Sequence, residues 1–482
     1  MKVHSIKYNA IFNMIYTLSN IIFPLITFPY VSRVLMASGN GKVNFFNSIA
    51  TYGTTIASLG LSTYGIRAVA RVRDDKKRLS KLTVELLLIN TIGTVIVVGF
   101  LIGSVFFVSK FRQENALFII TIMTIVLSVI GMSWLFSGLE QYDYITKRSV
   151  LFKFISLIMV FVFVKGENDY IKYALIMMFS TVGSYVLNFF YSMKFVDYRV
   201  SIHKINIKPH IKPTLILFSS ILAVSVYTNL DTVMLGFYSG DREVGLYTVA
   251  VKVEWLLLML INALSTVLLP RLSKHVEEKN MGMFNTLNRE SIKIVFFVSV
   301  PLTIFFIVMA KETIWTIGGT DYLSAVLCMQ ILMPVLVISG FSNVVGNQIL
   351  IPMGRDKSFL YAVSSGAVLN LIANIILLPK YGANGAAFST IVAEVTQMSI
   401  QLYFGRKIIK GNVNIFEVFK FLISSVIAGV SVIILQKNIV INPFVGLIIG
   451  SMEFGIVYII CLILFRDDFI FEVFNGLKEK LK

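Results

Sequence analysis

The sequence predicts an all-α integral membrane protein with about fourteen transmembrane helices, and three observations support this fold class. Hydrophobic residues make up 56% of the 482 residues and charged residues only 14%, whereas soluble domains are about half apolar and a quarter charged. The mean hydropathy is +0.80. The apolar residues lie in continuous runs of about 20, long enough to cross a bilayer as helices, and these runs lack the alternation typical of barrel strands.

The amino-terminal part of the chain contains six such runs. The glycine-containing segment Ser38–Gly41 separates the first two, and the basic segment Arg67–Lys81 separates the second from the third. Short segments that contain Lys110, Glu140 and Lys165 separate the others. The predicted spans are 8–36, 43–66, 82–108, 116–139, 146–164 and 171–193.

The carboxyl-terminal part contains eight further runs after a basic connection, 194–212. A turn at Gly240 separates the first two, and a second basic connection, 271–289, follows them. The fifth and the thirteenth run of the chain, 146–164 and 415–436, are short and are the weakest predictions. The spans predicted here are 214–238, 244–270, 290–310, 322–351, 358–379, 385–405, 415–436 and 443–465.

Three turns between spans resemble one another, which suggests an internal repeat. The segments are LMASGNGKVNFFNSIA, GFYSGDREVGLYTVAV and, more weakly, PKYGANGAAFSTIVAE. Tight turns favour glycine in any protein, but here the first and second spans also align with the seventh and eighth. Transporters are often built from such repeats. We therefore predict two lobes of six helices, 1–195 and 213–410, followed by two additional helices within 415–465.

The basic residues indicate the topology. Most of the 43 Lys and Arg residues lie in alternate connections, and cytoplasmic loops carry such an excess. Both termini are therefore expected in the cytoplasm. The cluster RAVARVRDDKKRLSK would contact anionic lipid, and no nucleic-acid partner is expected because no exposed folded domain is present. The first span is too long for a cleavable signal peptide.

Catalytic and metal-centred functions are not expected. The longest connections, 194–212 and 271–289, leave no room for a catalytic domain. Cys328 and Cys461 fall inside predicted spans, and the four histidines lie in the amino-terminal tail or in connections. This distribution predicts no disulfide, no zinc site and no cofactor.

Two prolines, Pro24 and Pro29, interrupt the first span. Each removes a backbone donor and clashes with the preceding turn, and a membrane helix tolerates this where neighbouring helices or water bind the freed carbonyls. We interpret them as a hinge that bends the helix. The alternative is that proline is simply more frequent in membrane helices than in soluble ones.

Ionisable residues within spans are candidates for function, because they are costly in a bilayer and usually face the interior of the bundle. Arg33 lies close to the outer end of its span and Lys153 towards the inner end of the fifth, so each is predicted either to bind a substrate or to snorkel to the interface. Asp231 and Lys252 lie at matching depths on adjacent spans. They are predicted to line the cavity or to form an ion pair between two helices.

Glu254 and Glu394 lie close to the predicted midplane, where a carboxylate must be protonated, bound to a cation or opposite a basic group. We interpret them as cavity or coupling residues, and H⁺ and Na⁺ are both left open as the coupling ion. The spans that contain NFFNSIATYGTTIASLGLSTYG and YTNLDTVMLGFYSG also carry polar side chains at helical spacing. Such residues line wet cavities or hydrogen-bond between helices.

Five segments together resemble the polysaccharide-repeat flippases, the Wzx-type family of the multidrug/oligosaccharidyl-lipid/polysaccharide exporter superfamily. These segments are FPLITFPYVSRVL, the basic cluster, NLDTVMLG, LLPRLSK and GANGAAFSTIVAE. The resemblance covers about residues 1–465. It implies two six-helix bundles around a cavity with two peripheral helices. It also implies that Arg33, Asp231 and Glu394 occupy polar positions that are characteristic of the family.

The resemblance also implies a function. A polyprenyl-pyrophosphate-linked oligosaccharide would move from the inner to the outer leaflet of the bacterial cytoplasmic membrane by alternating access, for capsule or O-antigen assembly, alongside the polysaccharide polymerase and glycosyltransferases. Phosphate favours basic side chains, yet the deepest charges here are three acids and one base. The alternatives are a flippase for lipid II or a teichuronic-type precursor, and an ion-coupled multidrug exporter. The latter lacks support in the first lobe, because Asp74 is the first acidic residue of the chain.

Overall fold

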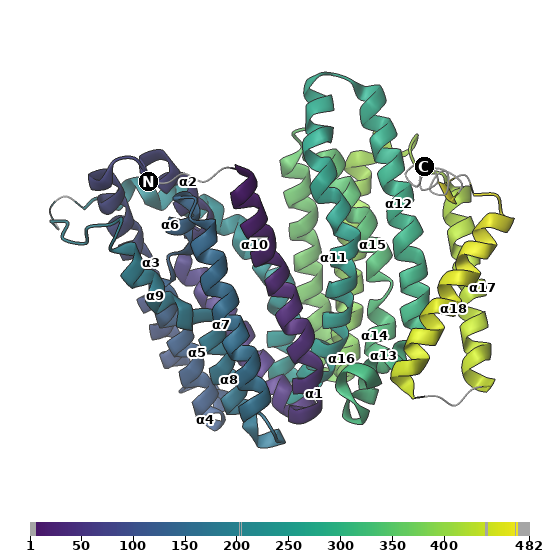
Figure 1. Cartoon of the computed structure of the whole chain (residues 1–482), viewed down its shortest axis with the longest axis horizontal. Helices are drawn as coiled ribbons and strands as arrows, with labels where there is room; N and C mark the ends of the chain where they lie inside the picture. Colours follow the sequence, from purple (N-terminus) through teal and green to yellow (C-terminus); the bar gives the residue numbers. More distant parts are fainter. Residues whose placement is uncertain (1–5, 202, 204, 439–441, 468, 471–482) are drawn as a thin grey trace. The chain divides into compact units, whose positions relative to one another are not determined.

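A computed structural model describes residues 6–201, 203, 205–438, 442–467 and 469–470. The chain divides into two compact units, Met1–Phe237 and Tyr238–Lys482, and each is described by itself. Both are built from helices (Figure 1). Within the described residues, nine helical segments are long and apolar enough to cross a membrane, and a further bent pair joins Thr320–Leu332 to Val335–Leu350. The protein is therefore a multi-pass membrane protein, and the count of fourteen spans stays a prediction.

The first unit is arranged around its first helix. This helix, α1 (Ile6–Ser58), packs against α3 (Lys76–Ser104), α5 (Asn115–Ser128) and α7 (Tyr142–Phe163). The other helices of the unit are α2 (Leu61–Val72), α4 (Ser109–Gln113), α6 (Ser133–Gly138), α8 (Tyr170–Met178), α9 (Ser184–Ser192) and α10 (Lys208–Tyr238), with a π-helical turn, η3 (Phe179–Gly183), between α8 and α9.

The long helix α1 contains two predicted spans joined by a sharp break at Met36 (φ 58°, ψ −179°). The side-chain amide of Asn40 donates to Ser32 Oγ across this break at 3.4 Å, and both residues are fully buried. The sequence suggested a glycine turn at Gly39, so the residue with the left-handed φ is three positions earlier than expected. Gly39 is needed for a different reason, because a Cβ there would approach the Glu167 carbonyl oxygen to 3.3 Å.

The prolines of α1 do not break it. The backbone stays helical through Pro24 and Pro29, and the non-helical residue inside α1 is Met36. The carbonyls that Pro24 and Pro29 leave without a backbone donor are those of Asn20 and Leu25, and the Thr27 hydroxyl donates to the neighbouring Phe23 carbonyl at 3.0 Å. A hinge at the prolines stays a prediction.

The second unit begins with α11 (Asp241–Glu277) and α12 (Met281–Val308), and its longest helix is α16 (Asp356–Ile409). Between them lie the shorter helices α13 (Ala310–Gly318), α14 (Val326–Leu332), α15 (Val335–Asn343) and a π-helical segment, η6 (Val344–Leu350). The two last helices, α17 (Ile415–Asn438) and α18 (Pro443–Leu464), are drawn in yellow in Figure 1 and pack side by side, with α17 also against α12.

Helix α16 also contains two predicted spans, and they form a hairpin. Its backbone breaks at Gly382 (φ 51°, ψ −130°), the position that the sequence repeat predicts. A Cβ on Gly366 would lie 3.0 Å from the Ala393 carbonyl oxygen, so the two halves of α16 are in close contact. Beyond the break, the Ala383 N–H donates to Glu243 Oε2 at 2.7 Å, which satisfies one of the free donors at the start of the second half.

Replacing Gly382 by alanine is expected to destabilise the second unit by about 2 kcal/mol or more, because a left-handed alanine is strained and the buried hydrogen bond is disturbed. The new Cβ would lie 2.4 Å from Glu243 Oε2. The thermal unfolding midpoint in detergent measures the effect. Gly99→Ala is the control, since a Cβ there meets no atom within 4 Å, and an equal loss in both variants would contradict the prediction.

Candidate functional site

Lys153 lies near the middle of α7, deeper than its predicted span suggested, because α7 begins at Tyr142 rather than at residue 146. Its Nζ donates to Ser19 Oγ at 3.1 Å and to Asn20 Oδ1. The ammonium also lies 5.2 Å from the centroid of the Tyr16 ring. Neutral groups of α1 therefore bind this cation, and no described carboxylate lies within salt-bridge distance of it.

A second cation, Arg148, lies five residues earlier on α7 and is buried, with 7% of its surface exposed. It hydrogen-bonds to Asn188 Oδ1 of α9, and its guanidinium carbon lies 5.6 Å from the centroid of the Tyr144 ring. Its Nε has no hydrogen-bond partner among the described residues. A buried guanidinium without a carboxylate is costly, so this part of the unit is suited to an anion. We call Arg148 and Lys153 the α7 cation pair.

The half of α1 that faces Lys153 carries a polar stripe. Three polar residues, Asn13, Thr17 and Asn20, follow one another at spacings of four and three residues, and all three are exposed, as are the apolar Met14 and Leu18 between them. This spacing places the three polar residues on one side of a helix. Exposed polar groups are costly against lipid, whereas a water-filled path suits them. Lys153 therefore lies beside a polar, accessible face of α1, whereas Arg148 points to another side of α7 and contacts Asn188 of α9.

Arg33, the other predicted cation of this unit, is exposed and lies one turn before the break at Met36. The nearby Tyr30 hydroxyl donates to the Val164 carbonyl at 2.8 Å, just beyond the end of α7. Arg33 is therefore near the opposite end of α7 from Arg148. The structure does not bring Arg33 together with the α7 cation pair.

In the second unit, α11 and the second half of α16 start side by side and run in the same direction. The contact of Glu243 with Ala383 joins their first turns, and the Tyr247 hydroxyl lies 3.1 Å from Thr390 Oγ1 further along. Glu254 follows Tyr247 by seven residues and therefore lies on the same side of α11.

Glu394 follows Thr390 by four residues and therefore lies on the same side of α16 as Thr390. At 1.5 Å per residue, Glu254 is about 20 Å from the start of α11, and Glu394 is about 17 Å beyond the break in α16. Their exposed fractions are 9% and 5%. The helical register thus places two buried carboxylates at similar depth, on the sides where these helices meet.

The remaining predicted charges have separate positions. Lys252 is half-buried on α11 and, being two residues before Glu254, points to a different side of that helix. Asp231 is buried on α10, within the first unit. Because the two residues belong to different units, their pairing stays a prediction.

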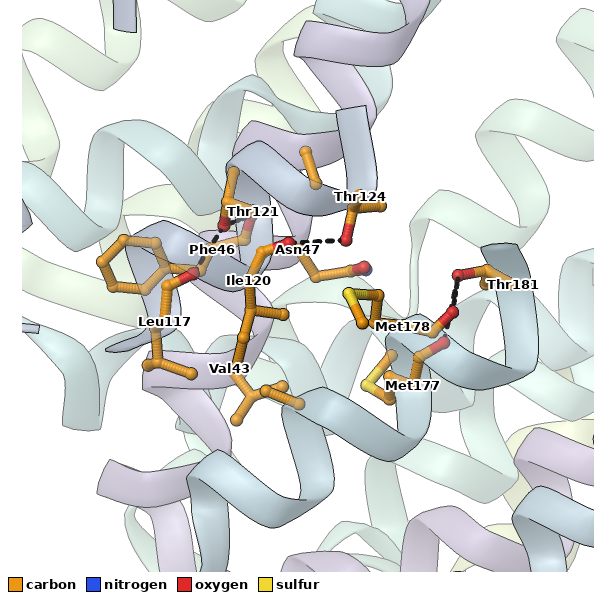
Figure 2. Close-up of a pocket in the computed structure, with 12 residues that line it drawn as sticks. Val43, Phe46, Asn47, Leu117, Ile120, Thr121, Thr124, Met177, Met178 and Thr181 are labelled. Carbon is orange, nitrogen blue, oxygen red and sulfur yellow. Dashed lines mark hydrogen bonds between the residues drawn. The ribbon is translucent and has the colours of Figure 1, made fainter. Parts of the chain in front are cut away.

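A small pocket lies in the first unit where the second half of α1, α5, α8 and η3 meet (Figure 2). Its volume is about 30 Å³, which is enough for about one water molecule and far too small for a drug-sized ligand. The hydroxyls of Thr121, Thr124 and Thr181 donate to carbonyls of their own helices. We therefore regard this pocket as a packing feature.

Sequence reasoning missed two parts of these sites. Arg148 lies near the start of the predicted span 146–164 and was not named as a candidate; the acidic Asp143 in the first turn is the signal that α7 starts earlier and that Arg148 is deeper. A polar layer in the second unit was also missed, in which Ser342 of α15 accepts from Gln397 at 3.1 Å and donates to Gln401 at 2.7 Å. The amide pairs four residues apart on α16 were its signal.

The fold and these charged groups define a class of protein. Ionisable side chains deep inside long apolar helices mark the substrate or ion pathway of a membrane transporter, and α1, α11 and α16 contain the turns that the sequence predicts to be repeated. The sequence profile of the polysaccharide biosynthesis protein family matches residues 6–276, more than half of the chain. This protein therefore belongs to that family, and a MatE profile also matches residues 216–376.

Curated relatives and solved structures agree with this assignment. A putative O-antigen transporter of Escherichia coli K12 is 23% identical over 408 residues, 83% of this chain and 97% of the relative. A probable low-salt glycan biosynthesis flippase of Haloferax volcanii is 20% identical over 232 residues, which are 47% of this chain and 49% of the relative.

The fold is similar to that of two solved transporters. The inward closed conformation of the lipid II flippase MurJ superposes with a TM-score of 0.75 at 17% identity, over 96% of this chain and all of that one. An inward-facing MATE family multidrug resistance transporter superposes with a TM-score of 0.61 at 15% identity, over 80% and 94% of the two chains. At these identities the likeness establishes the fold alone.

Proposed function

We propose that this protein is a flippase that moves polyprenyl-pyrophosphate-linked oligosaccharide repeat units from the inner to the outer leaflet of the bacterial cytoplasmic membrane, for O-antigen or capsule assembly. Its family and its O-antigen transporter relatives support this class of substrate. The observation that carries the proposal is the α7 cation pair, with Lys153 beside the polar stripe of α1. This arrangement offers positive charge without a competing carboxylate to a lipid-linked anion.

The chemistry of the substrate fits the groups available. The pyrophosphate carries the negative charge, and charge-assisted hydrogen bonds from Lys153 and Arg148 would be strong. The sugar hydroxyls need donors and acceptors, which the amide and hydroxyl groups of Asn13, Thr17 and Asn20 supply. The polyprenyl chain can stay in the lipid, because only the polar head has to be shielded from hydrocarbon. Such a flippase moves its substrate without a catalytic step.

The two buried carboxylates of the second unit, Glu254 and Glu394, are the proposed coupling residues. Two carboxylates at the same depth repel one another, and binding one H⁺ or Na⁺ between them would lower this cost. An ion gradient would then favour one conformation of the second unit over another. The choice between H⁺ and Na⁺ is left to experiment.

The rival substrates fit less well. A cationic drug would be repelled by the α7 cation pair, and α1 carries no acidic residue. Lipid II shares the pyrophosphate and polyprenyl groups, so its class remains the closest alternative. We place both termini in the cytoplasm from the distribution of basic residues, and we expect the polymerase and the glycosyltransferases that make and use the repeat unit to act beside the flippase.

The test is a flipping assay in proteoliposomes that contain lipid-linked oligosaccharide, in which an external glycosidase detects the transferred sugar. Wild-type protein is expected to expose the oligosaccharide faster than empty liposomes do. Lipid II in place of the oligosaccharide tests the alternative. Transport of a cationic dye, with no movement of either lipid, would contradict the proposal.

Replacing Arg148 by methionine separates function from stability. Methionine relieves the buried charge but leaves the buried Asn188 Oδ1 without its donor, which costs about 1–3 kcal/mol, so the thermal unfolding midpoint should fall by several degrees while the protein still folds. Flipping should fall, because the substrate phosphate loses a cationic partner. Loss of folding and flipping together would show that Arg148 is structural.

A further inference from the structure

Helix α10 is bound to the first unit at its amino-terminal end. His210 Nε2 lies 3.1 Å from Glu85 Oε2 of α3, and His210 Nδ1 lies 2.7 Å from the Tyr64 hydroxyl of α2. Glu85 is only 4% exposed, and its other oxygen accepts from the Asn206 N–H at 2.7 Å. A buried carboxylate with these partners is expensive to expose unpaired, so the network resists separation of α10 from α3.

The backbone of α10 also lies directly on the first unit beside this network. A Cβ on Gly60, just before α2, would be 2.8 Å from both the Thr214 carbonyl oxygen and the Phe218 nitrogen. Gly60 has a φ of 78°, so glycine is required there both for the turn and for the close approach. The contact therefore involves backbone as well as side chains.

The carboxyl-terminal end of α10 is bound to the same unit. Lys110 Nζ donates to the Gly236 carbonyl at 2.7 Å and lies 4.0 Å from the centroid of the Phe45 ring. The rings of Phe45 and Phe237 meet edge to face with centroids 5.1 Å apart. A Cβ on Gly236 would lie 2.1 Å from Phe45, so the ring packs against a bare backbone.

Within two residues, the chain passes from contacts with the first unit to contacts with the second unit. Phe237 packs in the first unit, whereas the Ser239 hydroxyl donates to the Leu378 carbonyl of the second unit at 2.8 Å. Between these anchors lies Tyr238, and Gly240 follows with a φ of 92° and no atom within 4 Å of the position of a Cβ. A left-handed glycine in open surroundings can change its dihedral angles at little cost.

We propose that α10 stays attached to the rest of the first unit throughout the transport cycle and that the backbone after it bends at Tyr238–Gly240. The sequence repeat instead assigns this helix to the second lobe and makes the connection 194–212 the linker. In our assignment Glu85, His210 and Lys110 are positioning residues that hold α10, and Asp231 travels with the first unit. The inference rests on the proposed flippase function, because it concerns the conformational cycle.

The test is a cross-link that fixes α10 to the first unit. Cys328 and Cys461 are both buried and free, and they are first replaced by alanine. Phe45→Cys and Phe237→Cys are then joined by a short bifunctional thiol reagent. Because α10 never leaves the first unit in our proposal, the cross-linked protein should keep more than half of its flipping rate. Loss of flipping on cross-linking, with both single-cysteine proteins active, would overturn the inference.

Two further measurements keep the result unambiguous. Lys110→Met should slow cross-linking between the two cysteines, because the lysine holds the end of α10 in place. A structural disturbance far from α10 would not change this rate. Lys212→Ala is the matched control, because that lysine is exposed on α10. Failure of the cysteines to cross-link would contradict the geometry itself. If the protein without a cross-link flips no lipid-linked sugar, the proposed function has failed instead.

Discussion

Replacing Lys153 by glutamine is expected to lower the flipping rate at least about tenfold, which corresponds to about 1.4 kcal/mol of lost interaction. Glutamine keeps hydrogen bonding to Ser19 and Asn20 but removes the charge. A pyrophosphate in a medium of low dielectric constant loses an interaction that water cannot replace. Initial rates in the proteoliposome assay, at saturating and at limiting substrate, would show whether binding or translocation is affected.

Two variants serve as controls for this result. Lys153→Arg keeps the charge and should retain part of the flipping rate. If Lys153 acted through packing alone, Lys153→Arg and Lys153→Gln would lower the flipping rate equally. Lys147→Gln removes a charge from the same helix, but that lysine is exposed and lies 3.6 Å from Asp143. Equal rates for Lys153→Gln and wild type would remove the α7 cation pair from the substrate path.

Replacing Glu394 by glutamine is expected to abolish the dependence of flipping on an imposed ion gradient. Glutamine has nearly the same shape, but it cannot bind a proton or compensate a sodium ion. The buried site would also no longer hold two negative charges, so the thermal unfolding midpoint should rise or stay unchanged. Flipping is measured with a proton gradient, with a sodium gradient and with neither.

Glu254→Gln should behave in the same way, because the helical register places the two carboxylates at similar depth where α11 and α16 meet. The control is Glu277→Gln, an exposed carboxylate at the end of α11. Unchanged gradient dependence in both buried variants would show that coupling, if present, resides elsewhere. A change in only one variant would assign the ion to that carboxylate.

Several elements could be predicted from the sequence because hydropathy and turn chemistry act locally. The apolar runs 8–36 and 43–66 meet a break at Met36, and the runs 358–379 and 385–405 meet one at Gly382. A membrane requires continuous hydrogen-bonded helices, so the length of a run predicts its helix. The candidate residues Glu254 and Glu394 could be named for a similar reason, since a carboxylate within an apolar run is conspicuous by itself.

Other features could not be predicted, because they depend on which helix lies opposite. Arg148 adjoins a basic residue in the sequence and resembles part of a connection, yet Asn188 and Tyr144 enclose it in the folded unit. Glu85 resembles an interfacial residue until His210 and Tyr64 are seen beside it. The contacts of Arg148 with Asn188 and of Glu85 with His210 join residues 40 and 125 positions apart, and such contacts leave no periodic signal in the chain.

The sequence by itself thus determined that this chain enters a membrane, which long apolar helices it forms, and which family it resembles, because the energetics of burying apolar helices in lipid depend on local composition. Only the tertiary structure decided which groups lie together. The pairing of Lys153 with α1, the contact of α11 with the second half of α16, and the attachment of α10 at Gly60 and Phe45 all follow from packing, since the partners of a buried group are set by the neighbouring helix and not by neighbours in the chain.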